Sequence, residues 1–205
     1  PDATDCAKMC IDTTGRMPMV KAAREYRSSL FYDDRAEFGA KLIAETQDDI
    51  RRNDKKGLRT AQRLNGTTDY AWEHIRFDGQ SMPERFQDVQ FYDYTKSVKR
   101  ARQHVAGNMP SNYHLTFSRS ESNEDQIAEN IAHGRNVTVV VDIPSRDHTT
   151  ATPTTWREIP TYDADRSDFR PNDPIGRVLI LRYKSAKASS LADALASGFV
   201  VPAFQ

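Results

Sequence analysis

The stretch from Val137 to Ile143 constrains the fold of this chain more than any other segment. It is a run of mainly β-branched residues, and it lacks the apolar–polar alternation of a strand that has one wet face. A parallel strand that is covered on both faces has this pattern. The segment therefore points to an α/β fold with a buried parallel sheet.

Further strands are expected at 58–64, 89–94 and 113–117, and shorter ones at 157–162, 177–183 and 199–201. Helical segments follow several of them, at 70–75, 98–105, 127–131 and 184–197. This repeated β-then-α order predicts right-handed crossovers and a parallel sheet. We expect a partial or distorted TIM-like barrel, because polar clusters follow at least three strands. An open doubly wound sheet, with its site at one switch point, is the alternative.

The N-terminal part of the chain has helical patterns in place of strand patterns. Apolar spacing predicts one helix from Pro18 to about Tyr32, and a second that is capped by Asp33 and Asp34 and ends near Gly57. We expect a single domain of 205 residues, with a cysteine-containing loop and two helices in 1–57 and a βα core in 58–205. Because the chain begins at Pro1, within what reads as a motif, we also expect a truncated N-terminus.

The composition limits which binding partners and which cellular compartment are expected. Lys plus Arg is 29 and Asp plus Glu is 29, so no overall field attracts nucleic acid and any such contact is local. No apolar stretch approaches the roughly 20 residues of a membrane helix. With only two cysteines, reduced thiols in a cytoplasmic protein are the expectation.

The two cysteines, Cys6 and Cys10, are the candidate metal ligands. Three residues separate them, a spacing that suits two thiolates on one zinc ion or iron–sulfur cluster, although two ligands do not complete a site. Two incidental buried thiols are the alternative. The 5 histidines form no His-x-x-x-His pair, and the sequence has no nucleophile elbow, phosphate-binding loop or dinucleotide fingerprint.

Polar turns follow three of the expected strands. Their amides, hydroxyls and charges can bind an anion or a sugar, but the same residue types also cap helices and form plain turns. A Lys can bind phosphate or act as a base, although an exposed Lys is commoner. The residues singled out in these turns are Asn65, Thr67, Asp69, Lys96, Arg119 and Glu121.

An acidic loop over 163–173 is the most unusual segment. Asp163, Asp165 and Asp168 lie close together there, beside Arg170. Several carboxylates in one loop repel one another unless Arg partners, a cation or raised pKa values relieve them. A solvated acidic turn is the alternative.

Several of these segments together resemble the family of phage and plasmid proteins named for gene product 88. The matching stretches cover almost the whole chain: 6–16, 63–69 with Trp72 and Glu73, 91–96, 112–121 and 163–173. The resemblance implies a further cysteine just ahead of the position of Pro1, which would complete a three-cysteine constellation.

That constellation in front of a βα barrel is similar to the radical S-adenosylmethionine enzymes, although Thr13 stands where their third cysteine belongs. A second likeness is to the tRNA-guanine transglycosylases and their DNA-acting phage relatives, which are barrels with a structural metal and catalytic aspartates. Both are analogies of fold, and a fold does not determine a function.

We therefore expect a metal- or iron–sulfur-assisted enzyme of a phage or plasmid that acts on a nucleotide or a nucleic acid base. The candidate catalytic residues are Asp69, Asp163, Asp165 and Asp168. The candidate substrate-binding residues are Asn65, Thr67, Lys96, Arg119, Glu121 and Arg170. This hypothesis assumes that all these turns face one hollow. The alternative is a non-catalytic accessory protein that binds a host protein or DNA through the same loops, and the neutral charge favours a protein.

Overall fold

The computed structural model describes residues 20–147, 149–184 and 190–204. The expected metal ligands Cys6 and Cys10, and the expected helix start at Pro18, lie outside these residues. No helix in the described ranges is both long enough and apolar enough to cross a membrane.

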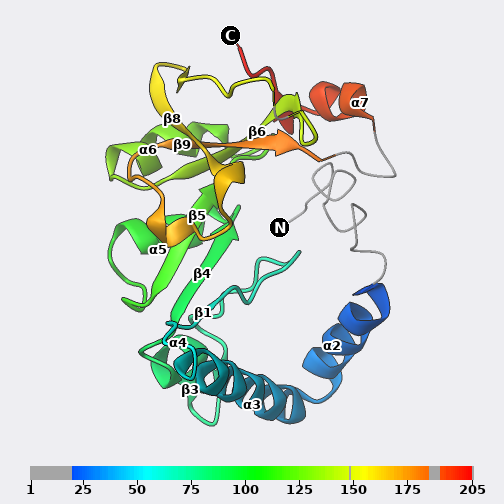
Figure 1. The fold of residues 1–205 in the computed structure, drawn as a ribbon, viewed down its shortest axis with the longest axis vertical. Helices are drawn as coiled ribbons and strands as arrows, with labels where there is room; N and C mark the ends of the chain where they lie inside the picture. The colour runs from blue at the N-terminus through cyan, green and yellow to red at the C-terminus, as the bar shows by residue number, and fades with distance from the viewer. Residues whose placement is uncertain (1–19, 148, 185–189, 205) are drawn as a thin grey trace. The chain divides into compact units, whose positions relative to one another are not determined.

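In the described residues, eight strands form a mostly parallel sheet (Figure 1). Its order is β1-β4-β5-β6-β9-β8-β7, and β10 also pairs with β6. The strands are β1 (Ala61–Gln62), β4 (Gln90–Thr95), β5 (Tyr113–Ser118), β6 (Val137–Pro144), β7 (Thr155–Trp156), β8 (Ile159–Asp163), β9 (Val178–Tyr183) and β10 (Val200–Val201). The predicted α/β class is confirmed. No pairing joins β1 to β7 among the described residues, and the partial barrel stays a prediction.

The chain forms two compact units. Of the described residues, the helical unit holds 20–93 and 109–114, and the sheet unit holds 94–108 and those from 115 onward. The two N-terminal helices thus belong to the same compact unit as β1 and most of β4.

Two long helices open the helical unit, α2 (Lys21–Asp33) and α3 (Arg35–Asp54). The Asp34 side chain caps α3 by accepting a hydrogen bond from the Glu37 backbone N–H at 2.9 Å, as the sequence predicted. The apolar faces of the helices pack on one buried cluster: Phe31, Trp72, Phe77, Met82, Val89, Phe91 and Tyr113. Gly39 permits close packing there, since an added Cβ would lie 2.3 Å from the Phe77 ring.

The prediction of a helix over 70–75 is wrong, because that segment is a turn that leads into a hairpin. The Asn65 side chain bonds both the backbone N–H and the carbonyl of Tyr70, so these groups are held by a side chain. The hairpin pairs β2 (Arg76–Phe77) with β3 (Gln80–Ser81) in antiparallel fashion. The short helix α4 (Met82–Arg85) follows, with a capping box formed by Ser81 and Glu84.

Strand β6 lies in the core of the sheet unit and is buried on both faces, as its sequence predicted. Val137, Val139 and Val141 are fully buried in one apolar cluster, which also contains Phe117. Val140 packs against a second cluster, which includes residues of α7 (Leu191–Ala196) and β10. Successive side chains of a strand point to opposite faces, so the two clusters cover the two sides of the sheet.

Two further helices of the sheet unit appear where the sequence placed them. Helix α5 (Val98–Val105) begins after Ser97, whose hydroxyl accepts from the Arg100 backbone N–H at 3.4 Å. Helix α6 (Ile127–Ala132) is followed by Gly134 at a φ of 68°, the left-handed conformation that ends many helices. Short 3₁₀ turns complete the unit: η3 (Glu124–Gln126), η4 (Ala164–Arg166) and η5 (Arg170–Asn172).

Candidate functional site

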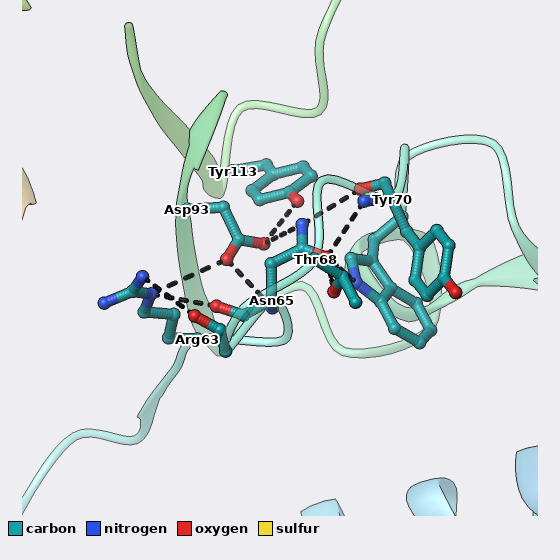
Figure 2. Close-up of polar contacts among 8 residues, drawn as sticks. Arg63, Asn65, Thr68, Tyr70, Asp93 and Tyr113 are labelled. Atoms are coloured by element: carbon teal, nitrogen blue, oxygen red, sulfur yellow. Dashed lines mark hydrogen bonds and ion pairs between the residues drawn. The ribbon is translucent and has the colours of Figure 1, made fainter. Parts of the chain in front are cut away.

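Asn65 is the centre of a buried polar network in the helical unit (Figure 2). Its side-chain oxygen accepts three hydrogen bonds, from Thr68 Oγ1 at 2.8 Å, the Tyr70 N–H at 3.0 Å and Trp72 Nε1 at 3.0 Å. Its side-chain nitrogen donates to the Tyr70 carbonyl at 3.0 Å and to Asp93 at 3.2 Å. Asn65 is only 1% exposed, and these internal bonds shape the turn after β1.

Asp93 is the acceptor on which this network ends. Its fully buried carboxylate accepts from the Asn65 backbone N–H at 2.9 Å and from Tyr113 Oη at 2.7 Å, and Arg63 Nε lies 4.0 Å away. Asp93 was not among the residues predicted from the sequence, although a signal for it was present. Asp93 falls on the same strand face as the apolar Phe91, which indicates a buried carboxylate.

The other two predicted residues of this turn lie at the surface of the helical unit. Thr67 is exposed and Asp69 is partly buried. Their roles in substrate binding and catalysis stay predictions, as does the role of Asn65.

A second group of residues, the Arg119 cluster, gathers around the turns that follow β4 and β5 in the sheet unit. We define it as Lys96, Arg119, Glu121, Glu124, Arg157 and Phe199. Strand β5 pairs with β6 only at its last two residues, Phe117 and Ser118. Farther along β6, strand β10 pairs with Val140 and Val141, while β9 occupies the other edge throughout. The chain after Ser118 therefore leaves the sheet where β10 takes over beside β6.

Arg119 is the buried member of the cluster. Its backbone N–H donates to the Thr138 carbonyl at 2.9 Å and its side chain is 4% exposed. The guanidinium donates to the carbonyls of Gly198 at 2.7 Å and Phe199 at 3.1 Å, and to Glu124 Oε2 at 2.7 Å. These bonds tie the turn after β5 to the start of β10.

Lys96 and Glu121 lie beside Arg119. Lys96 Nζ donates to the Arg119 carbonyl at 3.3 Å and lies 4.8 Å from the centre of the Phe199 ring. Glu121 packs next to Gly198, where an added Cβ would lie 3.8 Å from the Glu121 Cβ. The sheet unit thus brings these three sequence-predicted residues together.

Glu124 lies between two guanidinium groups, because it forms ion pairs with both Arg119 and Arg157. Burial alone would raise the pKa of the Glu124 carboxyl, but the two arginines hold that pKa below its usual value. The Arg157 guanidinium also lies 4.5 Å from the centre of the Trp156 ring. Glu124 and Arg157 were not among the residues predicted from the sequence, and their ion pair joins positions that are distant in the chain.

The acidic loop forms a separate group at the carboxyl ends of β8 and β9. Arg182 Nη1 contacts both oxygens of Asp163, at 2.9 and 3.0 Å, and the Arg182 N–H donates to Asp165 at 2.8 Å. Asp168 is exposed. The sequence predicted that Arg partners, a cation or raised pKa values would relieve the repulsion among these carboxylates. Arg182 is such a partner for Asp163 and Asp165.

Arg170 is as deeply buried as Asn65, at 1% exposed. It donates to the Ala164 carbonyl at 2.8 Å and pairs with Asp173 at 3.0 Å. Burial raises the pKa of Asp173, and the neighbouring Arg170 partly offsets this effect. The hydrogen bond from Arg170 to the Ala164 carbonyl joins η5 to η4 inside the loop.

A cavity of about 710 Å³ lies in the helical unit, near the amino end of β4. Charged and polar residues form part of its wall, among them Asp54, Arg59, Asp88 and Gln90. The residues singled out from the sequence do not line it. Within the described ranges, no group of three or more His, Cys, Asp and Glu side chains could hold a metal ion.

The family model described as Gene product 88 matches residues 1–202. This match covers nearly all of the 205 residues and agrees with the resemblance found in the sequence. No curated protein and no solved structure matches the chain.

Proposed function

We propose that this chain, which belongs to the Gene product 88 family, is an enzyme of a phage or plasmid that acts on a nucleotide or on a nucleic acid base. The Arg119 cluster is the observation that carries the proposal. It combines a lysine, an aromatic ring and two carboxylates around the turns that follow β4 and β5. In sheets of parallel strands, ligands bind beyond the carboxyl ends of the strands.

The residue types in the cluster suit the parts of a nucleotide. Lys96 is a compact positive charge that can contact a phosphate, and the Phe199 ring beside it can contact a base. Arg119 already donates to two carbonyls and a carboxylate, so we assign it a positioning role. It holds Glu124 and the Gly198–Phe199 backbone in place.

Asp168 is the best candidate for the acid or base among the three predicted aspartates of the acidic loop. Asp163 and Asp165 are engaged by Arg182, whereas the Asp168 side chain makes no hydrogen bond or ion pair with the described residues. Because β8 is parallel to β9, and β9 to β6 and β5, the loop and the Arg119 cluster follow the same edge of the sheet. A carboxylate within hydrogen-bond reach of the substrate could transfer a proton.

The proposed metal or iron–sulfur cluster would depend on Cys6 and Cys10. Two thiolates would supply part of a ligand set, and the bound group would contribute Lewis acid or redox chemistry. No step of the reaction is assigned to it.

The experiment is a titration of the full chain with the four ribonucleoside monophosphates and a short single-stranded oligonucleotide, followed by mass spectrometry of the products. We expect saturable binding and a modified base or nucleotide. Lys96→Ala should weaken binding about tenfold, because it removes a hydrogen bond to a charged group. Lys99→Ala is the matched control, since Lys99 is exposed on α5.

Two results would contradict the proposal. If Lys96→Ala and Lys99→Ala bind the ligands with equal affinity, the Arg119 cluster is not the binding site. Binding without any turnover across the panel would favour the non-catalytic accessory protein.

A further inference from the structure

The turn between β7 and β8 has an unusual backbone. Thr155 pairs with Pro160 and Trp156 with Ile159, so only Arg157 and Glu158 remain in the turn. Their φ angles are 49° and 65°, in the left-handed region that residues with a Cβ rarely adopt.

The hairpin of the helical unit shows the usual solution. Its two turn residues are Asp78, with φ 48°, and Gly79, with φ 81°. Asp and Gly tolerate this conformation far better than Arg and Glu do. The Arg157–Glu158 turn is therefore strained for its residue types, and strain of this kind concentrates at functional sites.

The strained turn sets Arg157 at the Arg119 cluster. Its side chain is 49% exposed, packs against the buried Trp156 ring and pairs with Glu124. Polar atoms without a hydrogen-bond partner among the described residues are also buried here: Arg119 Nε, Glu121 Oε2 and Trp156 Nε1. Each of these three atoms could form a hydrogen bond with a polar ligand.

We propose that Arg157 binds a phosphate group of the ligand by leaving Glu124. This inference rests on the proposed function, and it names phosphate as the group that the Arg119 cluster recognises. A guanidinium binds phosphate with two parallel hydrogen bonds, which a half-exposed arginine can form without unfolding its surroundings. Lys96 supplies the second positive charge.

The charges balance in this exchange. Before binding, Glu124 is shared by Arg119 and Arg157. After binding, Glu124 keeps Arg119 as its partner, so this partly buried carboxylate is not left without a counter-charge. Glu124 thus competes with the ligand for Arg157.

The test measures binding of inorganic pyrophosphate to the full chain by calorimetry. Arg157→Gly removes the guanidinium and suits the left-handed turn, so affinity should fall about tenfold while the melting temperature holds or rises. Glu158→Gly relieves the same turn but keeps Arg157, so its affinity should match the wild type. Glu124→Gln should bind several-fold more tightly, because the competing charge is gone while its amide oxygen can still accept from Arg119.

Each outcome decides between the two proposals. If Lys96→Ala weakens pyrophosphate binding while Arg157→Gly does not, the role of Arg157 is refuted and the proposed function stands. If the wild type binds a nucleotide but no pyrophosphate, phosphate recognition by Arg157 is refuted and the proposed function stands; if it binds neither, both fail. If Arg157→Gly does not fold, Glu124→Gln alone decides the test. Pyrophosphate binding by Glu124→Gln that is unchanged or weaker would refute the proposal that Arg157 leaves Glu124 to bind phosphate.

Discussion

Replacement of Asn65 by alanine should destabilise the protein severely, because Asn65 holds the turn after β1 from the inside. The variant would lose all five of its side-chain hydrogen bonds, three accepted and two donated. Trp72 is 4% exposed, so its indole N–H would remain buried without an acceptor. A buried unpaired group costs about 1–3 kcal/mol, and we add about 1 kcal/mol each for the Tyr70 backbone and for Asp93. The expected loss is about 3–5 kcal/mol.

Urea unfolding of the full chain, followed by circular dichroism, measures this loss as a shift of the midpoint at constant slope. Thr68→Val is the matched control, because it removes only one of the bonds to Asn65 and should cost about 1 kcal/mol or less. A loss below about 1 kcal/mol for Asn65→Ala, together with abolished ligand binding, would refute the structural role. It would support the substrate-binding role that the sequence suggested.

Three further predictions follow from single contacts. Gly39→Ala should cost about 1–3 kcal/mol in urea unfolding, since its Cβ would overlap an aromatic ring, whereas Gly66→Ala meets nothing within 4 Å and should be neutral. The lowered pKa of the Glu124 carboxyl should contribute to the free energy of unfolding fully above pH 4.5, its usual pKa, and this contribution should be lost as the pH falls below that value. In Glu124→Gln, the free energy of unfolding should therefore depend less on pH below 4.5. Metal analysis of anaerobically purified protein should find iron or zinc that Cys6→Ser and Cys10→Ser remove; equal content in all three proteins would contradict the cofactor proposal.

Most strands of the parallel sheet and most helices could be predicted because their signals are local, whereas the short strands β2, β3 and β7 were not predicted. The Val137–Ile143 run, the Asp34 cap and the Ser97 cap each act within a few residues, and the structure places β6, α3 and α5 at these positions. The failure at 70–75 has a non-local cause. The Asn65 side chain bonds the Tyr70 backbone, and Asn65 is itself held by Asp93, which lies 28 residues away in the chain.

The candidate site was only partly accessible from the sequence for the same reason. Lys96 and Arg119 could be selected because each follows a strand, and the carboxyl ends of parallel strands meet at one edge. Arg157 gave no such signal. Its partner Glu124 is distant in the chain, and its left-handed backbone is not expected for arginine.

Hydrogen–deuterium exchange of the full chain, with and without a saturating nucleotide, tests the central claim most directly. We predict that protection appears in the peptides that contain Lys96, residues 118–124, Arg157 and Phe199, because these line the Arg119 cluster. Protection confined to residues 54–60 and 87–90, which line the cavity of the helical unit, would contradict the account and place the ligand there.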